Sequence, residues 1–579
     1  IRCRDGILVN QTPVIPLTRA SRAGAATFDQ GDITRYLADG RVPPWKNAAD
    51  HFSRASAAFE YEWRLLPGET TSFVVAVPFH PRAQQLKELA GLDDPGAAYA
   101  RAHEWTIAYW KERLDNFHIK LPPQAQPVEN AIRSNLAYIL INKDGPALQP
   151  GPRCYKRSWI RDGSMIAASL LQMGIDRDVR EYIDWYANYQ RADGFVPCIV
   201  DRRGPEAVPE HDSHGQFIYM IAEYFRFTRD TTWLRGKWDN VLRAASYIRK
   251  LRAEQKTDEY RFGTPDERAC FGLVPASISH EGYSAKPMHS YWDNFFCLRG
   301  LKDAAMIASA LGEKKAADDL AAEVEDYRFD LTNSLRLAMK NRMIDYVPGC
   351  VELGDKGGLS NTIILDPVDE LAVAPLLGIV NDLGTFWGEF EGRENGTARW
   401  FAYLPYEWRY VGTFVRLHDE ERAFTLFKAL MRDRRPAAWN GWSESVWRDS
   451  TGPNNLGDMP HAWVGSDFIR AVRSMFAYER GKDTALVVGA GIPEEWLSDT
   501  AGVAVRGLPT HYGLLDYTMK KQGEGVMVVL SGSLNLPAGK IIVRPPLSGH
   551  VRSVSGDARP GARNEEIILT RLPATIFVE

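Results

Sequence analysis

Two acidic residues of this sequence stand among aromatic side chains, where a carboxylate is unusual. Asp293 lies in HSYWDNFFCLRGL directly after Trp292, and Glu444 lies in AAWNGWSESVWRDS close to Trp442. An ionised carboxylate loses solvation in such surroundings, so it is either paired or its pKa is raised. A carboxyl group with a raised pKa can act as a general acid, and one that stays ionised can act as a base.

Cleavage of a glycosidic bond needs a pair of this kind. One carboxylic acid protonates the leaving oxygen, and the other carboxylate activates water or attacks the sugar. We therefore assign Asp293 as the acid and Glu444 as the base, and expect their carboxyl groups to lie roughly 6.5 to 9.5 Å apart, as inversion requires. Glu210, Asp212 and Glu281 are the alternatives if the pair does not face one another. The 17 tryptophans fit the stacking of sugar rings.

Four aspartates stand where predicted helices begin: Asp162, Asp212, Asp293 and Asp458. Aspartate is a favoured N-cap that stabilises a helix by about 0.5 to 2 kcal/mol, so all four can be structural. Capping explains Asp212 and Asp458 as well as function does. Asp162 in SWIRDG and Asp293 in SYWDNF have aromatic neighbours that no cap requires, although Asp162 can also form a buried ion pair with the preceding arginine.

The spacing of apolar residues predicts a mainly α fold that positions these acids. Residues 1–85 contain short strand-like runs between turns, and residues 86–124 read as a helical linker. About eleven amphipathic helices follow over residues 125–482, and strand-like runs return in 483–579. Paired helices that close into a ring leave their inner loops around a central pit. We predict an α/α toroid between an N-terminal β-sandwich-like domain and a C-terminal β domain.

Three segments of this sequence, SWIRDGSM, YWDNFFCLRGL and WNGWSESVW with the later GDMPHAWVGSDF, resemble the (α/α)6-barrel glycoside hydrolases, the group of glucoamylase, trehalase and processing α-glucosidase I. The similarity covers roughly residues 125–480. It implies an (α/α)6 barrel, exo action, inversion of the anomeric centre and no cofactor. It also implies Asp293 as the acid and Glu444 as the base. It implies that Trp159, Arg161 and Asp162 grip hydroxyl groups of the terminal sugar. Their predicted places at loop-to-helix junctions add His211, Asp212 and Trp442, and the predicted substrate-binding set also includes Trp292 and His461.

Three other activities fit parts of the pattern. A sugar phosphorylase on the same fold uses phosphate instead of water and needs no second carboxylate, so Glu444 argues against it. A polysaccharide lyase would use tyrosine, histidine and arginine, for which His211, His214 and Tyr219 are candidates. A non-enzymatic carbohydrate-binding protein needs only the aromatic pit.

Composition excludes several other classes. A net charge of -4 over 579 residues gives no support for nucleic-acid binding. No run of eighteen apolar residues predicts a membrane span. Six scattered cysteines without CxxC or HExxH give no metal motif, and His211 with His214 lacks a second ligand cluster, so we assign no metal. A carbohydrate is the expected partner. Because the chain starts without Met, we also expect a preceding segment of the same precursor. The sequence does not fix the compartment, and we favour the periplasm or secretion over the cytoplasm.

Overall fold

The structure is a computed structural model that describes residues 2–3, 6–9, 12–78, 94–449, 457–498, 502–535, 538, 540–546, 554–556, 558–561, 566–569 and 571–579. The chain divides into two compact units, Ile1–Arg113 and Leu114–Glu579. The predicted domain boundary at residue 85 lies outside the described residues.

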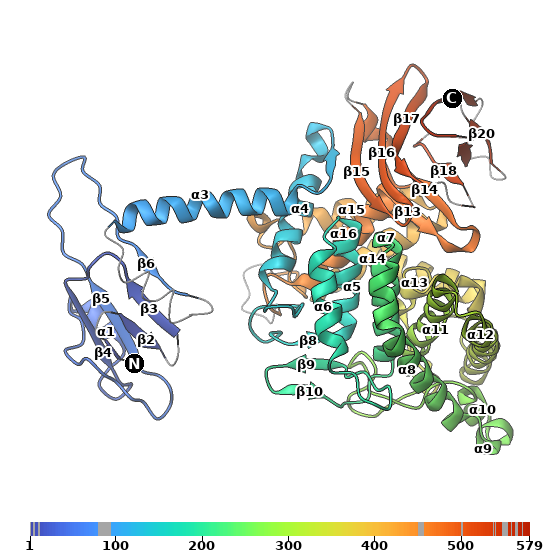
Figure 1. Ribbon diagram of the computed structural model, residues 1–579, viewed down its shortest axis with the longest axis horizontal. Coiled ribbons are helices and arrows are strands. Elements are labelled where there is room, and N and C mark those ends of the chain that lie inside the picture. The colour runs from blue at the N-terminus through green and yellow to red at the C-terminus, as the bar shows by residue number, and fades with distance from the viewer. Residues whose placement is uncertain are drawn as a thin grey trace. The chain divides into compact units, whose positions relative to one another are not determined.

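The first unit is small and rich in β-structure (Figure 1). Its elements are β1 (Arg2–Cys3), β2 (Ile7–Val9), β3 (Thr12–Pro16), β4 (Arg22–Ala26), α1 (Ile33–Ala38), β5 (Ser56–Glu60), β6 (Val75–Ala76) and α3 (Pro95–Leu114), which contains the point of division. One antiparallel sheet has the order β1-β2-β3-β6, and β4 pairs with β5. Among the described residues of this unit, Ile7, Ala25 and Ala48 form a buried apolar cluster.

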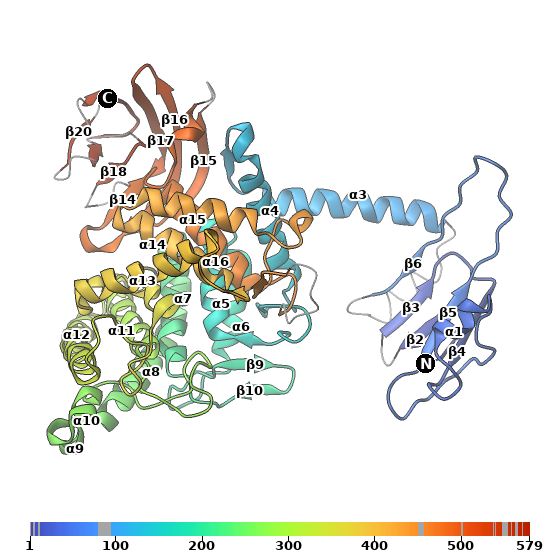
Figure 2. The ribbon, with the colours of Figure 1, turned by 180° about the vertical axis from the view of Figure 1, so that it is seen from behind.

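The second unit is mainly α-helical and has one large hydrophobic core. Its helices are α4 (Gln126–Ile141), α5 (Ile160–Gln172), α6 (Arg177–Ala187), α7 (Asp212–Thr228), α8 (Thr231–Gln255), α9 (Asp258–Phe262), α10 (Pro265–Cys270), α11 (Tyr291–Leu311), α12 (Lys314–Arg342), α13 (Leu376–Glu394), α14 (Trp408–Leu417), α15 (Glu420–Arg432) and α16 (Ala462–Phe476). Figures 1 and 2 show them from opposite sides. A closed circuit of contacts runs from α5 to α7, α11, the 3-10 turn η2 (Gly358–Ile364), α14, α16 and back to α5.

The helices of this circuit differ in character from those around them. Every residue of α5 from Ile160 to Leu171 is buried, and α7 is buried from Asp212 to Phe225. In contrast, α8, α12 and α15 bury one stripe and expose charged residues, as expected for helices that cover a core. Among the helices that the structure describes, none is both long and apolar enough to cross a membrane. The first turns of α5, α7 and α11 carry three of the predicted acids.

Two glycines allow α7 and α11 to approach closely. A Cβ on Gly215 would lie 1.9 Å from the backbone oxygen of Phe296, and a Cβ on Gly300 would lie 2.5 Å from the Cα of Gly215. Any larger residue at these positions would push the two backbones apart. The glycines therefore hold the N-terminal ends of α7 and α11 side by side.

Replacing Gly215 with alanine should destabilise the second unit by roughly 1 to 3 kcal/mol, because the added methyl group overpacks the contact. Thermal unfolding should show this as a lower Tm. The matched control is Gly236→Ala in α8, where a Cβ meets nothing within 4 Å; it should be neutral or stabilising by up to about 1 kcal/mol. Equal Tm values for the two variants would contradict the close approach of α7 and α11.

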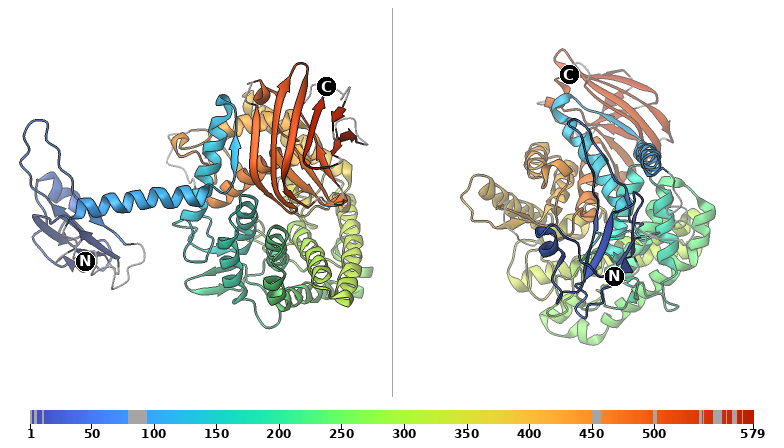
Figure 3. Two further views of the ribbon diagram at one scale, coloured as in Figure 1. Left: turned by 45° about the horizontal axis from the view of Figure 1, so that its top comes forward. Right: turned by 90° about the vertical axis from the view of Figure 1, so that its left-hand side faces the viewer.

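Two sheets follow α16, and Figure 3 shows the larger one. Their strands are β7 (His118–Lys120), β13 (Ala477–Arg480), β14 (Ala485–Val488), β15 (Val503–Thr510), β16 (Gly513–Gln522), β17 (Gly525–Leu534), β18 (Ile541–Val543), β19 (Val554–Gly556), β20 (Ala558–Pro560), β21 (Ile567–Leu569) and β22 (Ala574–Val578). The orders are β19-β22-β17-β16-β15-β7 and β13-β14-β18-β21-β20. Strand β7 comes from the predicted helical linker and pairs with β15 through Ile119 and Val505.

Short elements shape the loops at the N-terminal ends of the circuit helices. Strand β8 (Ser158–Trp159) leads directly into α5 and pairs with β9 (Ile199–Asp201), which pairs with β10 (Gly204–Glu206). Strand β11 (Ala402–Tyr403) pairs with β12 (Val446–Trp447), so the loop that carries Glu444 is tied to the approach to α14. The remaining 3-10 turns are η1 (Pro123–Ala125), η3 (Leu371–Val373), η4 (Pro405–Glu407), η5 (Ala437–Trp439), η6 (Gly481–Asp483) and η7 (Glu494–Leu497).

Candidate active site

A small cavity of about 60 Å³ lies where these loops meet the starts of α5 and α16. It contains three carboxyl side chains, one guanidinium group, one imidazole and several aromatic rings. Its lining residues are Pro150, Tyr155, Trp159, Arg161, Asp162, Glu281, Tyr406, Glu444, His461 and Trp463. Aromatic faces with a few convergent polar groups are typical of a site for a small polar ligand.

Glu444 is held on one side of the cavity by two phenols. The Tyr155 hydroxyl donates to Glu444 Oε2, and the Tyr406 hydroxyl lies 3.3 Å from Oε1. Burial and the neighbouring Glu444 carboxylate raise the pKa of Tyr155, so this phenol stays protonated and can donate. A Cβ at Gly457 would lie 2.7 Å from Glu444 Oε2, so the glycine makes room for the carboxylate. The side chain of Glu444 keeps 27% of its surface exposed.

His461 lies next to Glu444 in a neutral form. Burial lowers the pKa of His461 to about 4. Its Nδ1 accepts a hydrogen bond of 3.3 Å from the backbone N–H of Val464, so the ring proton is on Nε2, which lies 4.0 Å from Glu444. At neutral pH the two residues therefore do not form an ion pair.

Glu281 stands at the other side of the cavity, on the segment between α10 and α11. Its Oε1 accepts a hydrogen bond of 3.0 Å from Trp159 Nε1 and lies 3.8 Å from Arg161. Its side chain is 51% exposed. Glu281 has a φ of 65° and Ser279 a φ of 53°, both in the left-handed region that non-glycine residues rarely adopt. Strain of this kind concentrates at functional sites.

Arg161 and Asp162 form the polar base of the cavity. The Arg161 guanidinium pairs with Glu210, lies 3.7 Å from Asp162 and stacks over the Trp463 ring at 5.4 Å. Burial raises the pKa of Asp162 to about 7; Glu444 and Glu281 add to the rise, and Arg161 opposes it. The cavity thus holds three carboxyl groups against one guanidinium, and one proton is bound or lost there near neutral pH.

Three buried polar atoms at this base lack a hydrogen-bond partner among the described residues: Asp162 Oδ2, Arg161 Nε and Trp463 Nε1. Buried polar atoms are nearly always bonded, so each one left without a partner needs an explanation. Arg161 Nε and Asp162 Oδ2 face one another at 3.7 Å, as an ion pair without a hydrogen bond, and all three residues line the cavity.

Asp293, the predicted acid, lies in the first turn of α11 and is not among the residues that line this cavity. Asp293 is completely buried and does not line the cavity. Its two oxygens accept hydrogen bonds from Ser277 Oγ at 2.5 Å and Ser279 Oγ at 2.7 Å, and the backbone N–H of His211 is 3.3 Å away. Burial raises the pKa of Asp293, and these donors oppose the rise. Asp293 is thus bonded to Ser277 and Ser279, and Glu281, not Asp293, is the acid that faces the cavity from this region.

Four other predicted binding residues also lie behind the cavity. Asp212 is buried and accepts a hydrogen bond of 2.7 Å from Trp292 Nε1. His211 is buried, and burial lowers its pKa to about 4. Trp442 is buried and donates through Nε1 to the backbone oxygen of Leu430 at 2.8 Å. Asp212 and Trp292 lie in the first turns of α7 and α11, His211 is the N-cap of α7, and Trp442 lies in the loop before β12; all four are buried and none lines the cavity.

Helix capping does not explain the four aspartates at the predicted helix starts. Among the described residues, α5, α7 and α11 have no side-chain hydrogen bond at their N-caps, which are Trp159, His211 and Ser290. Asp458 instead accepts hydrogen bonds from the backbone N–H groups of Arg153 at 2.6 Å and Tyr155 at 2.9 Å. It therefore holds the loop that carries Tyr155.

Five predicted residues come together in the cavity, and several others were missed. Those that meet are Trp159, Arg161, Asp162, Glu444 and His461. Glu281 was named only as an alternative acid. Tyr155, Tyr406 and Trp463 were not predicted, although Trp463 stands two positions after His461 in the motif GDMPHAWVGSDF.

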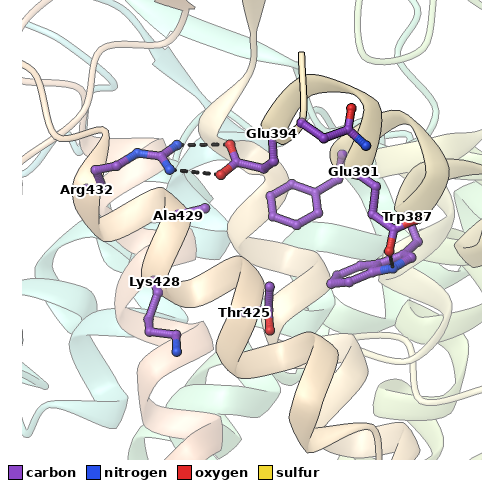
Figure 4. A pocket seen from close by; sticks show the side chains of 9 residues that line it. Trp387, Glu391, Glu394, Thr425, Lys428, Ala429 and Arg432 are labelled. Carbon is purple, nitrogen blue, oxygen red and sulfur yellow. Dashed lines mark hydrogen bonds and ion pairs between the residues drawn. The ribbon is translucent and has the colours of Figure 1, made fainter. Parts of the chain in front are cut away.

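A second hollow, of about 650 Å³, lies between α13 and α15 (Figure 4). Its acids are paired: Glu394 forms two bonds with Arg432, at 2.8 and 2.9 Å, and Glu391 accepts from Trp387 Nε1 at 2.8 Å. This hollow contains two carboxyl groups, and one of them is neutralised by a bidentate ion pair with Arg432. The smaller cavity is the better candidate for the active site.

The described residues contain one cluster whose ligand atoms could hold a metal ion, namely Cys270, His289 and Glu352, all within 4.8 Å. Glu352 already accepts from the backbone N–H of His289, at 3.1 Å, and lies 2.6 Å from its Nδ1. The two residues therefore satisfy one another, and the cluster lies outside the cavity lining.

Comparisons with known proteins bear on the fold of the chain. No model of a known protein family matches the chain. Its sequence is 24% identical over 156 residues to an uncharacterized glycosyl hydrolase of Methanocaldococcus jannaschii, a match that covers 25% of each chain. Its structure resembles the α-L-rhamnosidase from Dictyoglumus thermophilum, with a TM-score of 0.53 at 13% identity over 80% of this chain and 50% of the other.

Two further solved structures share the fold. A bacterial glucoamylase in complex with acarbose has a TM-score of 0.53 at 13% identity, over 80% of this chain and 71% of its own. The Streptomyces avermitilis α-L-rhamnosidase in complex with L-rhamnose has a TM-score of 0.51 at 13% identity. The match covers 80% of this chain and 42% of the rhamnosidase chain. The chain thus spans half the length of the first rhamnosidase and a quarter of the curated relative. It has the fold of these helical glycoside hydrolases, and the resemblance that its motifs indicate is confirmed.

Proposed function

We propose that this chain is an exo-acting, inverting glycoside hydrolase built on an (α/α)6 toroid. The observation that carries the proposal is the meeting of Glu281 and Glu444 in one small aromatic cavity, above the Arg161–Asp162 pair. The closed circuit of buried helices supports the toroid. The exo action is carried over from the resemblance of the motifs to the glucoamylase group.

The surroundings of the two glutamates support different roles. Glu444 accepts hydrogen bonds from two phenols, which fix its carboxylate oxygens at one side of the cavity, where a base would meet a water molecule. Glu281 is half exposed, at a point where a leaving group can depart into solvent. We therefore assign the acid to Glu281 in place of Asp293, and keep Glu444 as the base.

In the proposed reaction Glu281 gives its proton to the glycosidic oxygen as the bond to the anomeric carbon breaks. Glu444 takes a proton from a water molecule, whose oxygen bonds to the anomeric carbon from the opposite face. The sugar is released with inverted configuration. Asp162, Arg161 and Trp463 would hold hydroxyl groups, through contacts that strengthen as the ring flattens.

A panel of glycosides tests the proposal, starting with aryl α-L-rhamnosides and aryl α-glucosides because of the named structural neighbours. NMR of the first-formed sugar should show inversion. Release that requires phosphate would indicate a phosphorylase, and binding without turnover would indicate a carbohydrate-binding protein. An unsaturated product would indicate a lyase, although His211 and Tyr219, two of the residues named for that reaction, do not line the cavity.

Asp162→Asn should lower kcat by roughly 10- to 100-fold, the range for loss of a hydrogen bond to a charged group. It should also change the pH dependence of stability. Because the folded-state pKa of Asp162 is raised to about 7, its contribution to stability is present at low pH and is lost as the pH rises through 7. The Tm of the variant should therefore exceed that of the wild type at pH 8 by roughly 1 to 3 °C, and by less at pH 5. Unchanged kinetics would assign Asp162 a purely structural role.

A further inference from the structure

The segment that carries Glu281 is long and irregular, yet it is held firmly at its base. It runs from Phe271 to Ser290, between α10 and α11. Ser277 and Met288 exchange backbone hydrogen bonds of 3.0 and 2.9 Å, which close the segment into a loop. Glu281 stands inside this loop, only a few residues from Ser277.

Asp293 binds this loop from the first turn of α11. Ser277 Oγ donates to one carboxylate oxygen, at 2.5 Å, and Ser279 Oγ donates to the other, at 2.7 Å. Ser277 Oγ also accepts a hydrogen bond of 2.7 Å from the backbone N–H of Ser279. All three side chains are buried. The carboxylate therefore ties together the two serines that precede Glu281.

The residue next to Glu281 is held from the same turn of α11. The His280 ring packs against the ring of Trp292 with centroids 5.1 Å apart, and its Nε2 lies 2.8 Å from Ser360 Oγ. The first turn of α11 thus contacts both Ser279 and His280. These contacts hold the backbone in the left-handed conformation that it adopts at Ser279 and again at Glu281.

We infer that Asp293 is a positioning residue for Glu281: by binding Ser277 and Ser279 it keeps the strained backbone that aims the Glu281 carboxyl group into the cavity. This inference rests on the proposed acid role of Glu281. Left-handed backbone at non-glycine residues costs energy and persists only where surrounding contacts impose it. Without the carboxylate the loop should relax and the acid should move, and displacements of about 1 Å can cost 10²-fold in rate.

The test compares Asp293→Asn with Glu281→Gln on two glycosides of the sugar accepted in the panel, one with a 2,4-dinitrophenyl leaving group and one with an alkyl leaving group. We expect Asp293→Asn to lose 10- to 100-fold in kcat on the alkyl glycoside and less than about 3-fold on the activated one, with KM nearly unchanged. The double variant should be no slower than Glu281→Gln alone. Equal losses on both substrates, or additive losses in the double variant, would overturn the positioning role.

Asp382→Asn is the matched control, because Asp382 is also a buried aspartate and accepts a hydrogen bond of 2.6 Å from Asn361 Nδ2, outside the cavity lining. It should show no dependence on the leaving group. If Asp293→Asn fails to fold, Ser279→Ala removes one of the two hydroxyl contacts and should show the same pattern, weaker. A Glu281→Gln enzyme that shows no dependence on the leaving group would refute the proposed acid instead.

A second readout does not depend on turnover. Hydrogen exchange of the backbone amides in residues 277–283 should become faster in Asp293→Asn, while exchange in α5 stays unchanged. Unchanged exchange in this loop would overturn the inference even if the enzyme were slower.

Discussion

Replacing Glu444 with glutamine should lower kcat on every substrate by roughly 10²- to 10⁴-fold, the range associated with loss of general acid–base catalysis. Glutamine keeps the shape of the side chain but cannot take a proton from water. The identity of the leaving group does not change this requirement, so alkyl and activated aryl glycosides should suffer equally. Initial rates on both substrates measure the effect, and an unchanged Tm shows that the fold is intact.

A small anionic nucleophile offers a stricter test of the Glu444 assignment. Azide needs no deprotonation, so it should restore turnover of the activated glycoside and form the inverted glycosyl azide, which NMR identifies. Glu391→Gln is a suitable control, because Glu391 lies in the hollow between α13 and α15. A loss below 10-fold in Glu444→Gln would remove Glu444 from the reaction.

Glu281→Gln should give the opposite dependence on substrate. An alkoxide leaving group needs a proton, so kcat on alkyl glycosides should fall by roughly 10²- to 10⁴-fold. A 2,4-dinitrophenolate leaves without protonation, so the loss on that glycoside should stay below about 10-fold. Measured kcat and KM for the two substrates decide the matter.

The same experiment separates Glu281 from Asp293 as the acid. If Asp293 gave the proton directly, its asparagine variant would be at least as slow on alkyl glycosides as Glu281→Gln. The structure predicts the reverse order, because Asp293 is enclosed by serine hydroxyls whereas Glu281 lines the cavity.

Local sequence was sufficient to predict which residues line the cavity where these residues share one helix start or one loop. Trp159, Arg161 and Asp162 are nearly consecutive, so the turn that brings one of them to the cavity brings all three. Glu444 was predicted because several tryptophans lie close to it in the same loop. The mainly α character of the chain also followed from the spacing of apolar residues, because that spacing is a local property of each helix.

Only the tertiary structure decided which acid near α11 faces the cavity. Asp293 and Glu281 are close in sequence, but the first turn of α11 directs Asp293 into the core, and the irregular loop directs Glu281 outward. Aromatic neighbours mark a buried acid equally well whether it reacts or supports another residue. Strand β7 was not predicted for a related reason, since its pairing partner β15 lies far along the chain. The orientation of a side chain and the pairing of distant segments depend on contacts that no short stretch of sequence contains.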